Sequence, residues 1–274
     1  MTHQNKRNIL TQPENGLLHL DDKEGIIEVR NINVSYEKIQ VLFDIYCHFP
    51  SNMVTAIMGP SGCGKSTLIK VLNRTIEIVP GAVIRSGEVL FHGIDLYGTR
   101  QDPMLIRKKI GIIHQQPIPF PMSIIDNVTF GAKFHRLYSK QGKKEYAAIF
   151  LERVGLLAEI KDRLNESASK LSGGQQQRLC LARTLANQPE IILMDEPCSA
   201  LDPAATKLIE QLIQDLSRDY TIIIVTHNMS QAKRISDHSI FMFEGRIIEA
   251  GLTKQIFESP KTELAKAFIE GQIG

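Results

Sequence analysis

The feature that most constrains this chain is the stretch GPSGCGKST at residues 59–67. It fits the pattern G-x-x-x-x-G-K-[ST], and it lies between an apolar run, VTAIM at 54–58, and a segment of helical periodicity that starts at Lys65. Glycines let such a loop turn its backbone N–H groups toward phosphate oxygens, and the following helix adds its positive end. The sequence therefore predicts a phosphate-binding loop between a buried strand and a helix.

The residues predicted to contact the phosphates are Gly59, Pro60, Ser61, Gly62, Cys63, Gly64, Lys65, Ser66 and Thr67. Lys65 is expected to reach the β- and γ-phosphates, and the Ser66 hydroxyl to bind Mg²⁺. ATP and Mg²⁺ are thus the expected ligands. The alternative, a glycine-rich turn that matches by chance, is disfavoured by the flanking strand and helix.

Two other apolar runs end in residues that suit phosphate chemistry. IILMDEP places Asp195 at the carboxyl end of a buried strand, where ligands gather in open α/β sheets, and predicts it as a Mg²⁺ partner. Glu196 comes next and is expected to polarise an attacking water; its alternatives are a surface carboxylate or a helix-capping acid. TIIIVTHN ends a third strand at His227, a candidate contact to the γ-phosphate or a structural, hydrogen-bonded histidine.

IGIIHQQP places Gln115 and Gln116 at one more strand end. An amide at this position could sense the metal or the attacking water. From the residues alone, this assignment and that of His227 both stay open.

The segment LSGGQQQRLCLAR, from Leu171, puts Gly173 and Gly174 directly before a predicted helix. The pair exposes backbone N–H groups, and Ser172 adds a hydroxyl, which together describe a second anion site. Because the loop around Lys65 already holds phosphates, we expect this second site to face the ATP of another copy, in a head-to-tail pair. Ser172 as a helix N-cap is the alternative, and both can hold at once.

The order of the runs predicts an α/β core interrupted by a helical insert. Strand-like runs come first, residues from about 100 to 168 have helical periodicity, and strand–helix alternation then returns. We expect a flexible leader at 1–25, a nucleotide-binding domain at 26–257 with its helical subdomain at about 100–175, and a helical tail at 258–274. One face of the helix expected at 204–216 carries Leu208, Ile209, Leu212, Ile213 and Leu216.

Charge and cysteine content exclude several classes of function. Thirty-two basic and thirty acidic residues leave a net charge of +2, which disfavours a nucleic-acid or anionic-membrane binder. The four cysteines form no CxxC pair, so zinc is not expected, and they suit reduced, mostly buried thiols. No apolar run approaches the roughly 20 residues that span a bilayer. Work at a membrane would therefore need a partner.

The chain resembles the ATP-binding cassette (ABC) ATPases over about residues 26–257. The motifs that carry this resemblance are LSGGQ, the phosphate-binding loop, DEP, SALD and TH. The resemblance implies an α/β fold with a P-loop NTPase (RecA-like) core, an antiparallel β subdomain and a helical insert. It also implies that Tyr36 stacks on adenine and that Gln115, the preferred glutamine, binds metal. By the same resemblance, Gln175 would join Ser172, Gly173 and Gly174 in binding the nucleotide of the other copy. Asp202 would lie in a loop between protomers.

Within that family, four segments resemble the ATPase subunit of bacterial phosphate importers, the PstB family: PIPFPMSIIDNVTFG, DEPCSALDP, VTHNMSQAKRISDH and FIEGQIG. The resemblance implies a homodimer on the cytoplasmic face of the membrane, bound to two transmembrane permease subunits and served indirectly by an extracytoplasmic phosphate-binding protein, with no nucleic acid. An importer of another oxyanion or solute, a soluble non-transport ATPase of the same family and a P-loop kinase are the alternatives.

Overall fold

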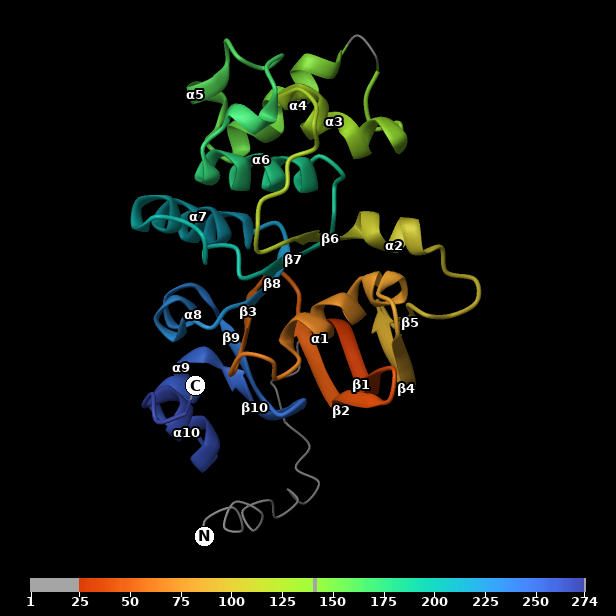
Figure 1. Cartoon of the computed structure of the whole chain (residues 1–274), viewed down its shortest axis with the longest axis vertical. Coiled ribbons are helices and arrows are strands. Elements are labelled where there is room, and N and C mark those ends of the chain that lie inside the picture. The colour runs from red at the N-terminus through yellow and green to blue at the C-terminus, as the bar shows by residue number, and fades with distance from the viewer. Residues whose placement is uncertain (1–24, 140–141, 274) are drawn as a thin grey trace.

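The computed structural model describes residues 25–139 and 142–273. Apart from Gly25, the predicted leader lies outside the described residues. The described residues form two sheets, and a group of helices stands at one end of the molecule, away from the smaller sheet (Figure 1).

The smaller sheet has the order β2-β1-β4-β5 and is antiparallel throughout. Its strands are β1 (Gly25–Tyr36), β2 (Ile39–Pro50), β4 (Ala82–Phe91) and β5 (Ile94–Asp95). The inner face of this sheet packs against helix α1 (Lys65–Leu72) in one hydrophobic cluster, in which Ile27, Val29 and Ile45 are fully buried. The expected antiparallel β subdomain is confirmed.

The larger sheet has the order β10-β9-β3-β8-β7-β6. Its strands are β3 (Val54–Met58), β6 (Ile110–Ile113), β7 (Ile191–Asp195), β8 (Thr221–Val225), β9 (His238–Phe243) and β10 (Arg246–Leu252). Only β10 is antiparallel to its neighbour, so β3, β6, β7 and β8 end at one edge, where ligands bind in such sheets.

The central strands are buried on both faces, as their continuous apolar runs predict. Met194 packs in the cluster that includes the helical insert, whereas Leu193 packs in the cluster that includes α1 and the antiparallel sheet. Alternate side chains point to opposite faces of a strand, so each strand serves both clusters.

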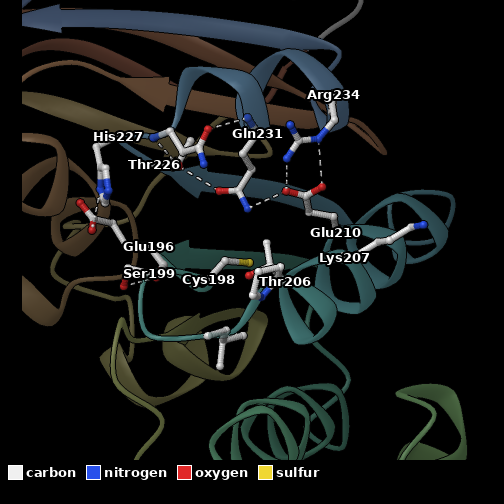
Figure 2. A pocket seen from close by; sticks show the side chains of 13 residues that line it. Glu196, Cys198, Ser199, Thr206, Lys207, Glu210, Thr226, His227, Gln231 and Arg234 are labelled. Atoms are coloured by element: carbon white, nitrogen blue, oxygen red, sulfur yellow. Dashed lines mark hydrogen bonds and ion pairs between the residues drawn. The ribbon is translucent and has the colours of Figure 1, made fainter.

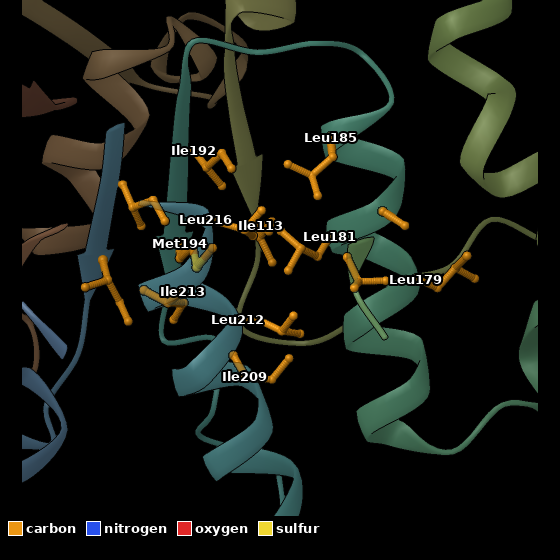
Figure 3. Close-up of a cluster of buried hydrophobic side chains, with 14 of the residues drawn as sticks. Ile113, Leu179, Leu181, Leu185, Ile192, Met194, Ile209, Leu212, Ile213 and Leu216 are labelled. Carbon is orange, nitrogen blue, oxygen red and sulfur yellow. The ribbon is translucent and has the colours of Figure 1, made fainter. Parts of the chain in front are cut away.

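The remaining helices cover the larger sheet and build the insert. They are α2 (Pro103–Lys109), α3 (Ile124–Phe134), α4 (Lys143–Arg153), α5 (Leu157–Ile160), α6 (Gly173–Leu185), α7 (Pro203–Leu216), α8 (Met229–Ile235), α9 (Thr253–Glu258) and α10 (Glu263–Ile269). Helix α6 lies between α3–α5 and α7 (Figure 1). Leu181 and Leu185 of α6 point toward Ile113, Ile192 and the α7 side chains (Figure 3).

The structure refines two expectations. The segment 100–175 contains β6, which pairs with β7 through Ile110 and Ile191, so the helices that stand apart from the sheet start with α3. IGII is too short to be separated from a helix by periodicity, and only its pairing identifies it as a strand. On α7, Leu208 is 40% exposed whereas Ile209, Leu212, Ile213 and Leu216 are buried, because Leu208 lies at the edge of the apolar face.

Candidate active site

The loop at residues 59–67 has the conformation that its glycines predict. Gly62 and Gly64 have φ angles of +79° and +104°, in the region that favours glycine. A methyl group on Gly64 would come within 2.7 Å of Leu42 Cδ2, and one on Gly59 within 2.1 Å of the Met242 carbonyl oxygen. The loop therefore requires glycine for its backbone angles and also for its close packing.

Helix α1 starts at Lys65, within this segment, and no side chain caps it at Gly64. The N–H groups of its first turn are thus available to an anion, which the helix dipole favours. A hollow of about 200 Å³ lies here, lined by Val41, Ser61, Gly62, Gly64, Lys65, Ser66, Thr67 and Glu196. We call it the phosphate-loop hollow.

Lys65 is 5% exposed, and backbone carbonyls hold its ammonium group. Its Nζ donates to the carbonyl oxygens of Gly59 at 2.8 Å and Pro60 at 2.7 Å. Neutral carbonyl dipoles compensate a buried cation only in part. Lys65 is therefore a cation ready to pair with an anion in the phosphate-loop hollow.

Ser66 and Asp195 meet as predicted. The Ser66 hydroxyl donates to Asp195 Oδ1 at 3.0 Å. Burial raises the pKa of Asp195 and the nearby Glu196 charge adds to the rise, whereas the Ser66 hydrogen bond acts in the opposite direction. A cation beside this carboxylate would offset the cost of its burial.

The donor set at this point fits Mg²⁺. The described residues contain no group of three or more His, Cys, Asp or Glu side chains that could hold a metal. A Mg²⁺ ion would therefore take oxygens from Ser66, from Asp195 and from a triphosphate, which matches its preference for a few protein ligands plus phosphates.

Glu196 is the centre of a second group of side chains, the glutamate cluster of Gln115, Glu196 and His227. Gln115 Nε2 donates to Glu196 Oε2 at 3.3 Å, and His227 Nδ1 lies 3.0 Å from the same oxygen. The three side chains come from the ends of β6, β7 and β8, the edge that the sequence predicted. Within the part of the chain that the structure describes, no hydrogen bond joins Gln116 to this cluster.

The cluster adjoins the phosphate loop, because Glu196 lines the same hollow as Lys65 and Ser66. Its carboxylate can accept a proton from a water molecule placed in that hollow, and Gln115 and His227 restrict its orientation. Tyr36 lies at the end of β1, where its hydroxyl is 3.2 Å from Thr67 Oγ1 at the start of α1. The predicted adenine-stacking residue is thus next to the phosphate loop.

The Ser172–Gly174 segment forms the start of α6, and the capping alternative is present. Ser172 Oγ accepts from the Gln175 backbone N–H, while Gln175 Oε1 accepts from the Ser172 N–H at 3.1 Å. A methyl group on Gly173 would meet nothing within 4 Å, whereas one on Gly174 would lie 3.0 Å from Ala205 Cβ. Capping therefore does not account for glycine at 173.

This segment lines a different hollow, of about 440 Å³, which we call the α6 hollow. Its other wall includes Asp202, which caps α7 by accepting from the N–H groups of Ala204 and Ala205 at 2.9 Å. The α6 hollow shares no lining residue with the phosphate-loop hollow. Within one chain, then, the structure does not bring Ser172, Gly173, Gly174, Gln175 and Asp202 to Lys65.

Sequence reasoning missed several residues near the cluster. Val41 lines the phosphate-loop hollow, although its strand carries no motif. Thr226 belongs to the TH motif, but the sequence predicts no role for it. Glu210 and Gln231 are buried polar residues next to the site, and a polar residue within an apolar helix face is the signal that could have found them.

Within the described residues, no helix has the length and apolar character needed to cross a membrane. The family model described as ABC transporter matches residues 42–199. The fold is similar to that of cbiO1 from Clostridium perfringens, described as part of the ABC transporter complex cbiONQ. The TM-score is 0.76 and the sequence identity 28%, over 91% of this chain and 99% of cbiO1.

A second similar structure is a bacterial Atm1-family ABC exporter with ATP bound. The TM-score is again 0.76, with 24% identity over 90% of this chain and 42% of the exporter. This chain therefore spans less than half of the exporter, and at that identity the similarity concerns the fold alone.

Proposed function

Because the chain belongs to the ABC transporter family and is the ATPase subunit of such a transporter, we propose that it drives an importer and that the solute is inorganic phosphate. The observation that carries the catalytic part is the meeting of Gln115, Glu196 and His227 beside Lys65 and Ser66. The phosphate assignment is supported by the four sequence segments that resemble phosphate-importer ATPases.

In the proposed reaction, Lys65 and the N–H groups of the phosphate loop hold the triphosphate, and Tyr36 stacks on the adenine. Glu196 accepts a proton from water while the water oxygen attacks the γ-phosphorus. The bond to the bridging oxygen breaks, ADP leaves, and inorganic phosphate forms. Bound Mg²⁺, held by Ser66, Asp195 and Gln115, would neutralise charge on the phosphate oxygens. His227 holds the γ-phosphate.

A second copy completes the site. The α6 hollow and the phosphate-loop hollow are separate within one chain. In a head-to-tail pair, Ser172, Gly173, Gly174 and Gln175 of each copy would close over the ATP of the other, with Asp202 between the two sites. Exposed N–H groups at a helix N-terminus suit the γ-phosphate.

The permease subunits are proposed to dock on a groove formed by α3 of the insert and by α2. Met104, Phe130 and Phe134 are 50%, 55% and 66% exposed and line a groove of about 990 Å³ beside α3. Exposed apolar surface of this kind marks an interaction site. The segment between Gln115 and α3 joins the groove to the glutamate cluster, which suits transmission of motion. With the permease docked there, the chain is proposed to lie at the cytoplasmic face of the membrane.

Glu196→Gln tests the catalytic proposal. The variant keeps the shape of the side chain but cannot accept the proton, so hydrolysis should fall by at least about 100-fold while ATP still binds. Closed dimers should accumulate with ATP, as measured by sedimentation. A variant that stays monomeric at saturating ATP would count against the head-to-tail pair.

The solute needs its own measurement. Uptake of labelled inorganic phosphate by cells that carry wild-type chain, Glu196→Gln or no chain should follow ATPase activity. If phosphate uptake is the same in all three while uptake of another oxyanion follows the chain, the solute assignment is wrong and the ATPase assignment stands.

A further inference from the structure

A third hollow, of about 610 Å³, lies between α7 and α8 and reaches Glu196 and His227 (Figure 2). We call it the α7–α8 hollow. Part of its wall is a series of hydrogen-bonded side chains that the proposed reaction does not use. We call this series the Gln231 network, and it consists of Thr226, Gln231, Glu210 and Arg234.

The contacts of the Gln231 network run without a break from β8 to α7. The Thr226 hydroxyl donates to Gln231 Oε1 at 2.9 Å, and Gln231 Nε2 donates to Glu210 Oε1 at 3.2 Å. Arg234 donates to both Glu210 oxygens, at 3.1 and 2.7 Å. Thr226 and Gln231 are each 3% exposed and Glu210 is 9% exposed. Buried polar groups that are fully paired specify one arrangement of the elements that carry them.

Hydrogen bonds of the network hold the backbone on both sides of His227. Thr226 Oγ1 accepts from the Asn228 N–H at 3.0 Å, so this bond closes a turn around His227. The Asn228 side chain in turn accepts from the Gln231 N–H at 3.0 Å. The His227 ring itself is 59% exposed and touches Glu196. Its direction therefore depends on the turn that carries it.

The other end of the network lies on α7, whose first turn is capped by Asp202 at the α6 hollow. Glu210 follows Asp202 by about two helical turns. A helix moves as a rigid element over that length, so a displacement at Asp202 reaches Glu210.

We propose that Thr226 and Gln231 are positioning residues that set the orientation of the His227 ring. Through them, a displacement of α7, caused by a second copy that binds at the α6 hollow, changes that orientation. This inference rests on the proposed role of His227 at the γ-phosphate. It supplies a route within one chain from the copy-to-copy contact at Asp202 to the catalytic end of β8.

The test compares Thr226→Val with Thr226→Ser. Valine keeps the shape and removes the hydroxyl, whereas serine keeps the hydroxyl. The kcat of ATP hydrolysis should fall about three- to tenfold in Thr226→Val, because the net free energy of one hydrogen bond corresponds to a rate factor of this size. The KM for ATP should stay within about twofold of wild type. Thr226→Ser should restore kcat.

Gln231→Leu is the second variant, and it should lower kcat in the same way. Its control is Gln211→Leu, on the exposed side of α7, which should leave kcat unchanged. The ring nitrogen resonances of His227, assigned with a His227→Gln variant, should shift in Thr226→Val and Gln231→Leu but not in Thr226→Ser or Gln211→Leu.

Wild-type kcat and unshifted His227 resonances in both Thr226→Val and Gln231→Leu would overturn the inference and leave the proposed function standing. A wild-type protein that hydrolyses no ATP would overturn the proposed function instead. The His227 resonances would then still decide on the network, because they need no turnover.

Discussion

At the scale of single residues, Glu196 combines a strained backbone with a central position in the site. Its φ of +49° is a left-handed conformation that costs a non-glycine residue roughly 1–2 kcal/mol. The Glu196 N–H donates to the Val225 carbonyl at 2.9 Å, and its own carbonyl accepts from Ser199 Oγ at 3.1 Å. Such strain persists where the surroundings impose it, commonly at functional sites. Here it accompanies the approach of the carboxylate to Gln115 and His227.

The glycine pair gives a residue-scale prediction because its two members differ. Gly173→Ala should keep or raise the melting temperature, because open space surrounds the new methyl group and alanine favours a helix. Its ATP hydrolysis should nevertheless fall by about tenfold or more, because the methyl group would lie against the partner's triphosphate.

Gly174→Ala should lower the melting temperature as well, because its methyl group would press on Ala205. Melting curves and phosphate release measured on both variants separate the two effects. Normal hydrolysis by Gly173→Ala would contradict a role for this turn at the γ-phosphate.

At the scale of elements, α3 and α6 together hold the segment that joins Gln115 to the insert. Asn127 of α3 is fully buried, and its amide donates to the carbonyls of Phe120 and Ser123 and accepts from the Phe120 N–H. Arg183 of α6 donates to the Ile118 carbonyl at 3.1 Å, and its guanidinium lies 4.1 Å from the centre of the Phe120 ring. The segment is therefore held from two helices.

Asn127→Ala should lower the free energy of unfolding by about 2–4 kcal/mol, because it leaves several buried backbone groups of the segment without partners. Urea unfolding measures the loss. Asn165→Ala, at an exposed position of the insert, is the control and should change little. Equal losses in the two variants would show that the segment does not depend on this amide.

Another element-scale contact joins the two sheets. Glu190, just before β7, lies 2.6 Å from His92 Nε2 after β4 and 2.9 Å from Lys109 Nζ at the end of α2. Burial alone would raise the pKa of Glu190, but the hydrogen bonds from His92 and Lys109 outweigh it and lower the pKa. A lowered carboxylate pKa stabilises the fold above the unfolded-state value, near 4.3, and this gain is lost as pH falls.

Glu190→Gln should therefore be less stable than wild type by about 0.5–1 kcal/mol at pH 7, since the contact is partly exposed. The difference should shrink as the pH falls below about 4. Thermal unfolding between pH 7 and about pH 3 measures it, because the loss is expected only below the unfolded-state pKa. The exposed Glu258→Gln is the control. A difference independent of pH would rule out the ionised carboxylate as its source.

At the scale of the whole molecule, the separation of the α6 hollow from the phosphate-loop hollow is the decisive feature. One chain presents an anion-binding loop at one place and, at another, the start of α6, where open space surrounds Gly173. Both surfaces can bind the same ATP if two copies pair, so that the start of α6 in each copy faces the phosphate loop of the other. The two copies are then related by a two-fold axis, and the pair contains two equivalent sites.

Activity should therefore depend on concentration. Well below the dissociation constant of the pair, a tenfold dilution should lower the ATPase rate per chain by about tenfold, because the fraction of paired chains falls in proportion. Phosphate release measured over a dilution series, with sedimentation at the same concentrations, gives the comparison. A rate per chain that stays constant while the protein is monomeric would show that one copy suffices.

Much of the fold follows from local patterns in the chain. The runs IILMD and TIIIV predict strands buried on both faces, and Met194 and Leu193 indeed pack in different clusters. The prediction is weaker where the pattern is short. IGII is recognised as β6 only through its pairing with β7, and Leu208 is seen to be exposed only once α7 is packed.

For the candidate site, too, some features follow from local sequence patterns and others only from the packing of the chain. The backbone of the phosphate loop is set by the glycines between VTAIM and Lys65, because φ angles and close packing depend on the residues themselves. The approach of Gln115, Glu196 and His227 at the ends of three parallel strands follows from the apolar runs that precede them. The sequence alone therefore determined the phosphate loop and the candidate catalytic residues. Only the tertiary structure decided that Ser172 and Lys65 lie in separate hollows, and that Gln231 and Glu210 join α7 to His227. Those arrangements depend on contacts between segments distant along the chain, which no local pattern encodes.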